Sequence, residues 1–191
     1  MVQRSSFGSI RTDHRSLPPT SFSVTVITSV VNILTTLIAI ATVDKVGRKP
    51  LLLIGSVGMT ISLAVMAFVF QTADVVTVDG VATPQLGDAA GVAALIAANV
   101  FVIAFGMSWG PVVWVLPGEM FPNGIRALAV AVAAAAQWLA NFYITATFPV
   151  LADAGLVLAY GLYAAFALAS FVFVLKWVRE TKGVELEDMP E

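Results

Sequence analysis

Long stretches without any charged residue alternate with short charged segments along the chain. Five such stretches contain no Asp, Glu, Lys or Arg, and the shortest of them has 22 residues. A helix needs roughly 20 apolar residues to cross the hydrocarbon core of a bilayer. The pattern therefore predicts five transmembrane helices, over residues 22–43, 51–71, 92–116, 127–150 and 155–177.

The composition supports this interpretation. Of the 191 residues, 59% are hydrophobic and 12% are charged, and the charged share is about half that of a soluble domain. A large soluble helical core is the alternative, but the predicted helices lack the polar faces that such a core needs. We therefore predict an all-α membrane protein.

Several classes of function are excluded by what the chain lacks. It contains no cysteine, which excludes disulfides, iron–sulfur clusters and thiol chemistry. Its formal net charge of −2 argues against nucleic acid as a partner. No ionisable residue lies inside the predicted spans, although proton relays and ion sites in membranes normally need such groups. The single histidine, His14, precedes them all. We expect no catalytic residue, no metal, no cofactor and no enzyme activity.

The basic residues gather at one end of the predicted bundle. That end holds Lys45, Arg48, Lys49, Arg126, Lys176, Arg179 and Lys182, whereas the loops at the other end hold Asp74, Asp79, Asp88 and Asp153. Lys and Arg stay on the cytoplasmic side during insertion. The pattern predicts a multi-pass protein of the plasma membrane with a cytoplasmic C-terminus and a first helix that enters from outside.

Three segments follow from this topology. Residues 21–178 form the predicted five-helix membrane domain, and residues 179–191 form a cytoplasmic tail. Residues 1–20 are polar and carry Arg4, Arg11 and Arg15 on the side where basic residues are not expected. We interpret this segment either as a disordered terminus or as sequence foreign to the membrane domain. It does not have the pattern of a signal peptide.

Polar side chains form stripes on two of the predicted helices. On the first, Thr25, Thr28, Asn32 and Thr35 share one face, and on the fourth, Gln137, Asn141 and Thr145 do. Because polar groups avoid lipid, both stripes are expected to face protein or a wet cavity. Threonines there are expected to bond between helices. The amides of Asn32, Gln137 and Asn141 either bind a hydroxyl-rich ligand such as a sugar or clamp helices together.

The third predicted helix carries both glycine and proline. Pro111 and Pro117 remove backbone donors and are expected to bend it, while Gly106 permits close approach of another helix. Broken helices mark binding sites and moving gates in transporters. Trp114 could stack on the apolar face of a sugar ring or could only pack, whereas Trp109, on another face, is expected to pack.

Charged residues at the helix ends form a separate group at the basic end of the bundle. Its members are Asp44, Arg48, Glu119, Arg126, Glu180 and Lys182. Such residues could pair across helices and hold one conformation closed. The alternative is that they only set the orientation, since exposed pairs are worth about 0–1 kcal/mol each.

Four segments resemble the C-terminal part of a sugar porter of the major facilitator superfamily, within its bacterial D-xylose–proton symporter-like group. They read D-K-V-G-R-K-P-L-L-L-I-G at 44–55, M-S-W-G-P-V-V-W-V-L-P-G-E-M-F-P-N-G-I-R at 107–126, A-A-Q-W-L-A-N-F at 135–142 and R-E-T-K-G-V-E-L-E-D at 179–188. The resemblance covers about residues 21–191. One departure is Arg179, where the family usually has proline.

The resemblance implies a fold, a substrate class and roles for individual residues. Such porters have twelve helices in two halves, with substrate between them, and this chain would supply helices eight to twelve. Asn32, Trp114 and Gln137 match sugar-contacting positions, and Asn141 lies one turn beyond the last of them. The residues that match the cytoplasmic latch of the outward-facing state are Asp44, Gly47, Arg48, Glu119, Arg126 and Glu180.

The functional hypothesis is a fragment of a monosaccharide transporter whose parent is a proton-coupled symporter working by alternating access. The family's first half and seventh helix, with the proton-coupling acidic residue and a glutamine pair, have no counterpart in these residues. Because alternating access needs two halves around one site, the chain is not expected to transport alone. The alternative is a non-transporting membrane protein, either an orphan product or a subunit that completes another chain.

Overall fold

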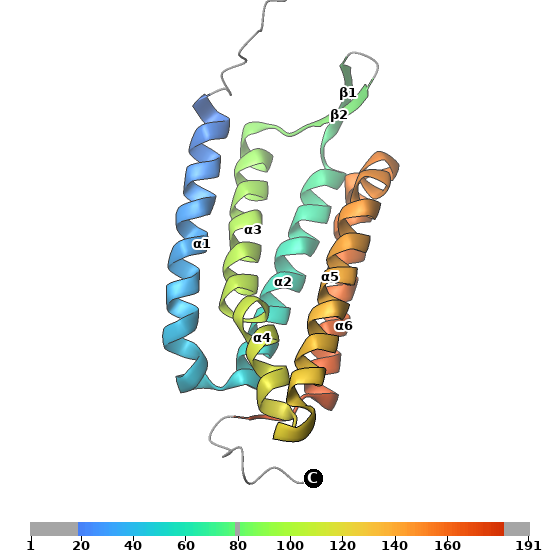
Figure 1. The fold of residues 1–191 in the computed structure, drawn as a ribbon. Helices are drawn as coiled ribbons and strands as arrows, with labels where there is room; N and C mark the ends of the chain where they lie inside the picture. The colour runs from blue at the N-terminus through green and yellow to red at the C-terminus, as the bar shows by residue number, and fades with distance from the viewer. Residues whose placement is uncertain (1–18, 79–80, 182–191) are drawn as a thin grey trace, which may run out of the picture.

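The computed structural model describes residues 19–78 and 81–181. Within these ranges the chain forms helices and one hairpin, whose order is shown in Figure 1. The elements are α1 (Pro19–Val46), α2 (Arg48–Gln71), β1 (Asp74–Val78), β2 (Val81–Gln85), α3 (Asp88–Met107), α4 (Trp109–Met120), α5 (Asn123–Ala154) and α6 (Leu156–Trp177).

The five predicted spans are confirmed. Among the described residues, five helical segments are long and apolar enough to cross a membrane, with α3 and α4 together forming the third. Of the expected tail over residues 1–20, only Pro19 and Thr20 are described, and they begin α1. Of the expected tail over 179–191, the residues from Lys182 onward lie outside the described part.

The third span is broken, as its prolines predicted. A proline ring clashes with the carbonyl four residues before it, so Pro111 disfavours a regular helix around Met107. Accordingly α3 ends at Met107, and Ser108 adopts φ −124° and ψ −86° before α4 begins. Pro117 lies inside α4, which continues to Met120.

The loop between the second and third spans contains a hairpin that the sequence analysis did not predict. β1 and β2 pair antiparallel, with Asp74 opposite Gln85 and Val78 opposite Val81. The sequence between the strands is Asp-Gly, a pair typical of two-residue hairpin turns. The hairpin lies at the end of the bundle opposite the one where α6 ends (Figure 1).

The centre of the bundle is α2. It packs on α6 and α3, while α1 packs mainly on α3, and α5 packs on α4 and α6. In the described part, α2 contributes more buried apolar residues than any other element, and α5 contributes none. Small residues permit the close contacts. A Cβ on Gly55 would overlap Ser108 of the broken span, and one on Gly106 would lie 3.0 Å from the Thr35 methyl group.

The expected hydrogen bonding of the first polar stripe is wrong for Thr35. Threonines on this stripe were expected to bond to other helices, but the Oγ1 of Thr35 donates to the carbonyl of Val31 in its own helix, at 2.6 Å. A buried threonine satisfies its hydroxyl at the preceding turn when no acceptor lies across the interface. Gly106, which faces the methyl group of Thr35 from α3, has no side chain that could accept this hydrogen bond.

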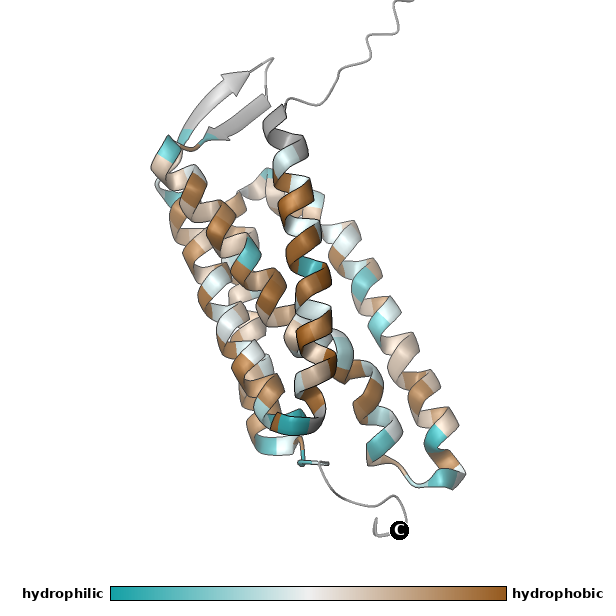
Figure 2. Cartoon of the chain, turned by 90° about the vertical axis from the view of Figure 1, so that its left-hand side faces the viewer, coloured by the Kyte–Doolittle hydropathy of each residue, from teal (hydrophilic) through white to brown (hydrophobic). Residues whose placement is uncertain are grey.

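The outer surface of the bundle is apolar. Many large hydrophobic side chains are exposed, among them Ile33 of α1, Phe68 of α2 and Phe166 of α6. In Figure 2, hydrophobic residues dominate the shafts of the helices, and hydrophilic residues gather near their ends. Such a surface suits hydrocarbon rather than water as its surroundings.

Candidate functional site

The charged group predicted at the basic end is assembled by five helix ends. α1 and α4 end there, α2 and α5 begin there, and the chain leaves α6 beside them (Figure 1). The arrangement brings Arg48, Glu119 and Glu180 together although they lie far apart in the sequence. We call these three residues, with Thr181, the charged cluster.

Arg48 and Glu119 form the centre of the charged cluster. The Nε of Arg48 donates to Oε2 of Glu119 at 3.0 Å, and its Nη2 donates to Oε1 at 2.7 Å. This two-point geometry is the strong form of an arginine–carboxylate pair. The two side chains are 13% and 25% exposed, so water screens them less than an ordinary surface pair. The pair ties the beginning of α2 to the end of α4.

Glu180 caps the beginning of α2. Its two carboxylate oxygens accept the backbone N–H groups of Arg48 and Lys49, at 2.9 and 3.1 Å. The first turn of a helix has unpaired N–H groups and a partial positive charge, both of which an anion satisfies. Gly47 makes this approach possible, since a Cβ there would lie 2.8 Å from a Glu180 oxygen. Its φ of 100° also suits only glycine without strain.

Thr181 in the cluster and Lys49 beside it were not among the sequence candidates. The Oγ1 of Thr181 donates to Oε2 of Glu119 at 2.7 Å. The Nζ of Lys49 donates to the carbonyl of Leu175 near the end of α6, at 3.1 Å, where a cation is favoured by the helix dipole. The sequence feature that could have indicated these two residues is adjacency, since Thr181 follows Glu180 and Lys49 follows Arg48.

Other predicted members of the charged group lie outside this cluster or outside the described part. The Nε of Arg126 donates to the carbonyl of Phe121 at 3.3 Å, and its buried Nη2 has no hydrogen-bond partner among the described residues. Asp44 lies in the last turn of α1, but its side chain is outside the described part, as is Lys182. The structure therefore brings Gly47, Arg48, Glu119 and Glu180 together, and leaves Arg126 apart.

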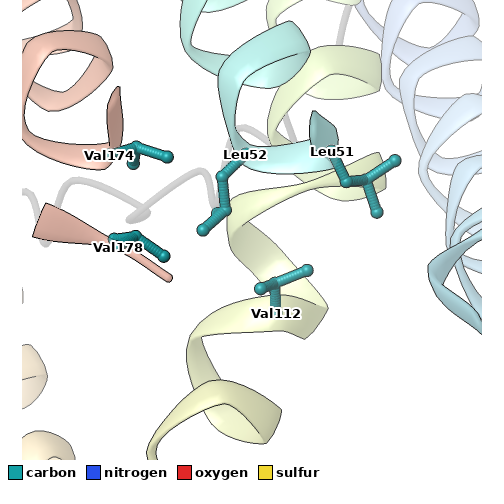
Figure 3. Close-up of a cluster of buried hydrophobic side chains, with 5 residues drawn as sticks. All are labelled: Leu51, Leu52, Val112, Val174 and Val178. Carbon is teal, nitrogen blue, oxygen red and sulfur yellow. The ribbon is translucent and has the colours of Figure 1, made fainter. Parts of the chain in front are cut away.

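A layer of apolar side chains lies on the membrane side of the charged cluster. Figure 3 shows its buried residues, which come from α2, α4 and the end of α6: Leu51, Leu52, Val112, Val174 and Val178. Leu51 and Leu52 follow Arg48 and Lys49 directly on α2, so apolar side chains lie next to the cluster on its membrane side. A low local dielectric strengthens the neighbouring ion pair.

The four predicted sugar-binding residues lie on three helices. Asn32 is on α1, Trp114 on α4, and Gln137 and Asn141 are on α5. Asn32 and Asn141 are exposed, Trp114 is 48% exposed and Gln137 is partly buried. Asn32 lines a shallow cavity formed by α1 residues alone. A larger cavity between α4 and α5 is lined by neither Trp114 nor Gln137 nor Asn141. These two cavities therefore do not bring the four side chains together.

The alternative role for the amides, a clamp between helices, finds no support within the described part. No hydrogen bond joins the side-chain amides of Asn32, Gln137 or Asn141 to another described residue. Trp109 differs from these residues, because it packs against both buried apolar clusters, and its predicted packing role is confirmed.

Comparison with known proteins identifies relatives along most of the chain. Residues 14–191 match the family described as "Sugar (and other) transporter". A glucose transport protein of Synechocystis is 58% identical over 170 residues, which cover 88% of this chain and 36% of that protein. The D-xylose-proton symporter of Escherichia coli K12 is 41% identical over 172 residues, which cover 86% of this chain and 32% of that protein.

Solved structures agree with these relatives. The inward-open xylose transporter XylE of E. coli matches with a TM-score of 0.74 and 40% identity, covering 89% of this chain and 35% of that one. XylE bound to 6-bromo-6-deoxy-D-glucose matches with a TM-score of 0.73 and 38% identity, covering 88% and 34%. These matches confirm the predicted resemblance and a multi-pass membrane protein. The chain spans about a third of the length of the relatives it matches.

The family match begins slightly earlier than expected. The resemblance was expected to start at about residue 21, whereas the match starts at residue 14. Residues 14–20 contain two prolines and one arginine and lack the hydrophobic pattern on which the first span was placed.

Proposed function

The chain belongs to the sugar transporter family, and from this premise we propose that it forms helices eight to twelve of a monosaccharide porter that works by alternating access. The observation that carries the proposal is the match of nearly nine-tenths of the chain to the xylose transporter at 40% identity. The named relatives are glucose and xylose transporters rather than enzymes, so a transport role is favoured over catalysis. Coupling to protons is proposed from the symporter among them.

The sugar would be held by Asn32, Trp114, Gln137 and Asn141. Amides can donate to and accept from the same ring hydroxyls, and an indole face suits the apolar face of a pyranose. These side chains are at least partly accessible, and their polar groups form no hydrogen bond to other described residues. They lie on α1, α4 and α5, so the site would be completed by the part of the porter that packs against those helices.

The charged cluster would act as the conformational latch. It joins the beginning of α2, the end of α4 and the segment after α6 at one end of the bundle. Opening that end would separate these elements and break the Arg48–Glu119 and Glu180 contacts. Contacts made in one state only bias the equilibrium toward that state. Arg126, another of the family positions, would join them only in another conformation. Asp44, whose side chain lies outside the described part, is proposed as a member of the same latch.

The basic end of the bundle would face the cytoplasm of a cell whose plasma membrane holds the protein. Lys45, Arg48, Lys49, Lys176 and Arg179 support this orientation by the positive-inside rule. The C-terminus would then be cytoplasmic. The partners of the chain would be the lipid bilayer, the monosaccharide and the N-terminal half of the porter.

Uptake of radiolabelled D-glucose and D-xylose tests the proposal. The chain is expressed in cells without their own transporters for these sugars, alone and together with the part of the Synechocystis relative that it does not match. We expect saturable uptake only when both are present. The Gln137→Leu variant should raise the KM about 10-fold, because one or two hydrogen bonds to the sugar are lost.

The matched control is Gln71→Leu, which removes an exposed amide at the last residue of α2. It should leave the KM unchanged. Saturable uptake by the chain alone would contradict the need for a second half. No uptake by the pair, despite correct membrane insertion of both parts, would favour the non-transporting alternative.

A further inference from the structure

A chain of hydrogen bonds crosses the middle of the bundle away from the charged cluster. The Nε1 of Trp109 donates to the Oγ of Ser56 at 2.9 Å. The hydroxyls of Ser56 and Ser170 lie 3.0 Å apart, and the Oγ of Ser170 also reaches the carbonyl of Ala167 at 2.7 Å. The bonds thus connect α4, α2 and α6, and Ser56 is completely buried.

The direction of these bonds is determined by the chemistry of the groups. An indole N–H can only donate, and a backbone carbonyl can only accept. Ser170 therefore donates to Ala167, which leaves its oxygen to accept from Ser56, and Ser56 accepts from Trp109. Each polar group in the series is satisfied, and hydrogen bonds that run in one direction strengthen one another at low dielectric.

The hydrogen-bond chain meets the third span at its break. Gly55 and Ser56 are neighbours on α2, and they contact Ser108 and Trp109, which are neighbours at the joint between α3 and α4. Gly55 allows Ser108 to lie directly against α2, and Ser56 fixes the indole of the next residue. A helix broken by proline has lost part of its own hydrogen bonding, so its orientation depends on such outside contacts.

We propose that Ser56, Ser170 and Trp109 are positioning residues that fix the direction of α4 and thereby the place of Trp114. Trp109 is the first residue of α4, and Trp114 lies five residues later on the same short helix. These three residues would not touch the sugar. The importance of Trp114 for sugar binding rests on the proposed function, whereas the fixing of α4 does not.

Fluorine NMR of the full chain labelled with 5-fluorotryptophan tests this proposal. The chain has four tryptophans, and replacing each by phenylalanine in turn assigns the four resonances. In lipid nanodiscs without sugar, Ser56→Ala should shift the Trp109 resonance, because its hydrogen bond is lost. It should also shift or split the Trp114 resonance, because α4 is released. Trp138, which is exposed on α5, should not move.

Ser62→Ala is the matched control. Ser62 is also a buried serine of α2, but its Oγ donates to Met59 in the same helix, at 3.0 Å. This variant should leave both resonances in place, whereas Ser170→Ala should reproduce the Trp114 shift of Ser56→Ala more weakly.

Three outcomes would overturn the proposal. An unmoved Trp109 resonance in Ser56→Ala would mean that the hydrogen bond does not exist. A moved Trp109 with an unmoved Trp114 would mean that the bond positions nothing. Shifts of Trp138 as well would show general loosening of the fold. Because no sugar is used, these results stand apart from the uptake assay, which tests the proposed function alone.

Discussion

Glu180 and Gly47 together allow α2 to begin where it does. The carboxylate takes the place of a side-chain cap at the beginning of α2, and the glycine both leaves space for it and adopts φ 100°. Neither residue can act alone, because the carboxylate needs the space and the turn needs the glycine. The charged cluster therefore rests on backbone geometry as much as on charge.

The Gly47→Ala variant should lose stability for two separate reasons. A positive φ costs a residue with a Cβ about 1–3 kcal/mol, and this Cβ would also displace the Glu180 carboxylate. The free energy of unfolding in SDS titrations of the purified chain measures the loss. Gly155→Ala provides the control, since Gly155 has φ 134° with nothing within 4 Å of the added Cβ. An equal loss for both variants would contradict a role for the Glu180 contact.

At this scale the sequence identified which residues are charged and at which end they lie, but not their partners. It grouped Arg48, Glu119 and Glu180 by their place at helix ends, and the structure joins them. The involvement of Thr181 and the separation of Arg126 depend on where helix ends meet in space. Hydropathy and charge patterns along the chain carry no information about such distances.

Among the elements, the broken third span departs most from a regular helix. The prolines predicted the interruption, and the structure places it at Ser108, three residues before Pro111. That offset is expected, because proline disturbs the turn that precedes it. Gly55 and Ser56 of α2 contact the joint between α3 and α4. Gly55 lies against Ser108, and Ser56 accepts the hydrogen bond of Trp109.

The Pro111→Ala variant should make α3 and α4 more continuous. Alanine restores a backbone N–H that can donate to the carbonyl of Met107, so the amides of residues 108–110 should exchange with deuterium more slowly. Mass spectrometry of the chain in nanodiscs measures this exchange. Pro50→Ala is the control, because Pro50 lies in the first turn of α2, where proline removes no helical bond. Unchanged protection at 108–110 would show that packing against α2, rather than Pro111, causes the break.

Hydrophobic stretches were sufficient to predict the spans, because lipid requires each crossing segment to satisfy its own backbone. The ends were less well predicted. The first turn of α5, Asn123–Arg126, follows Pro122 and is polar, so it carries no signal of lipid burial. The β1–β2 hairpin was missed since its short strands were taken together with the surrounding loop.

For the whole molecule, the distribution of buried residues is uneven. α2 is surrounded by other helices, whereas α5 contributes no buried residue although it is the longest described helix. The candidate residues Gln137 and Asn141 lie on this open helix, and Asn32 lies on α1, which packs mainly on α3. The sequence predicts the helix face on which each polar stripe lies. Whether the stripes meet in one sugar site depends on surfaces beyond these residues.

The topology is the central claim, since the sugar site and the charged cluster both depend on which end of the bundle faces the cytoplasm. The chain has no cysteine, so single cysteines introduced at Val46 and Gln85 can be labelled without background. Val46 lies at the charged end and Gln85 at the hairpin end, and both are exposed. A membrane-impermeant maleimide applied to intact cells should label Gln85→Cys and should label Val46→Cys only after the cells are opened. Labelling of Val46→Cys from outside, or of both positions from the same side, would contradict the account.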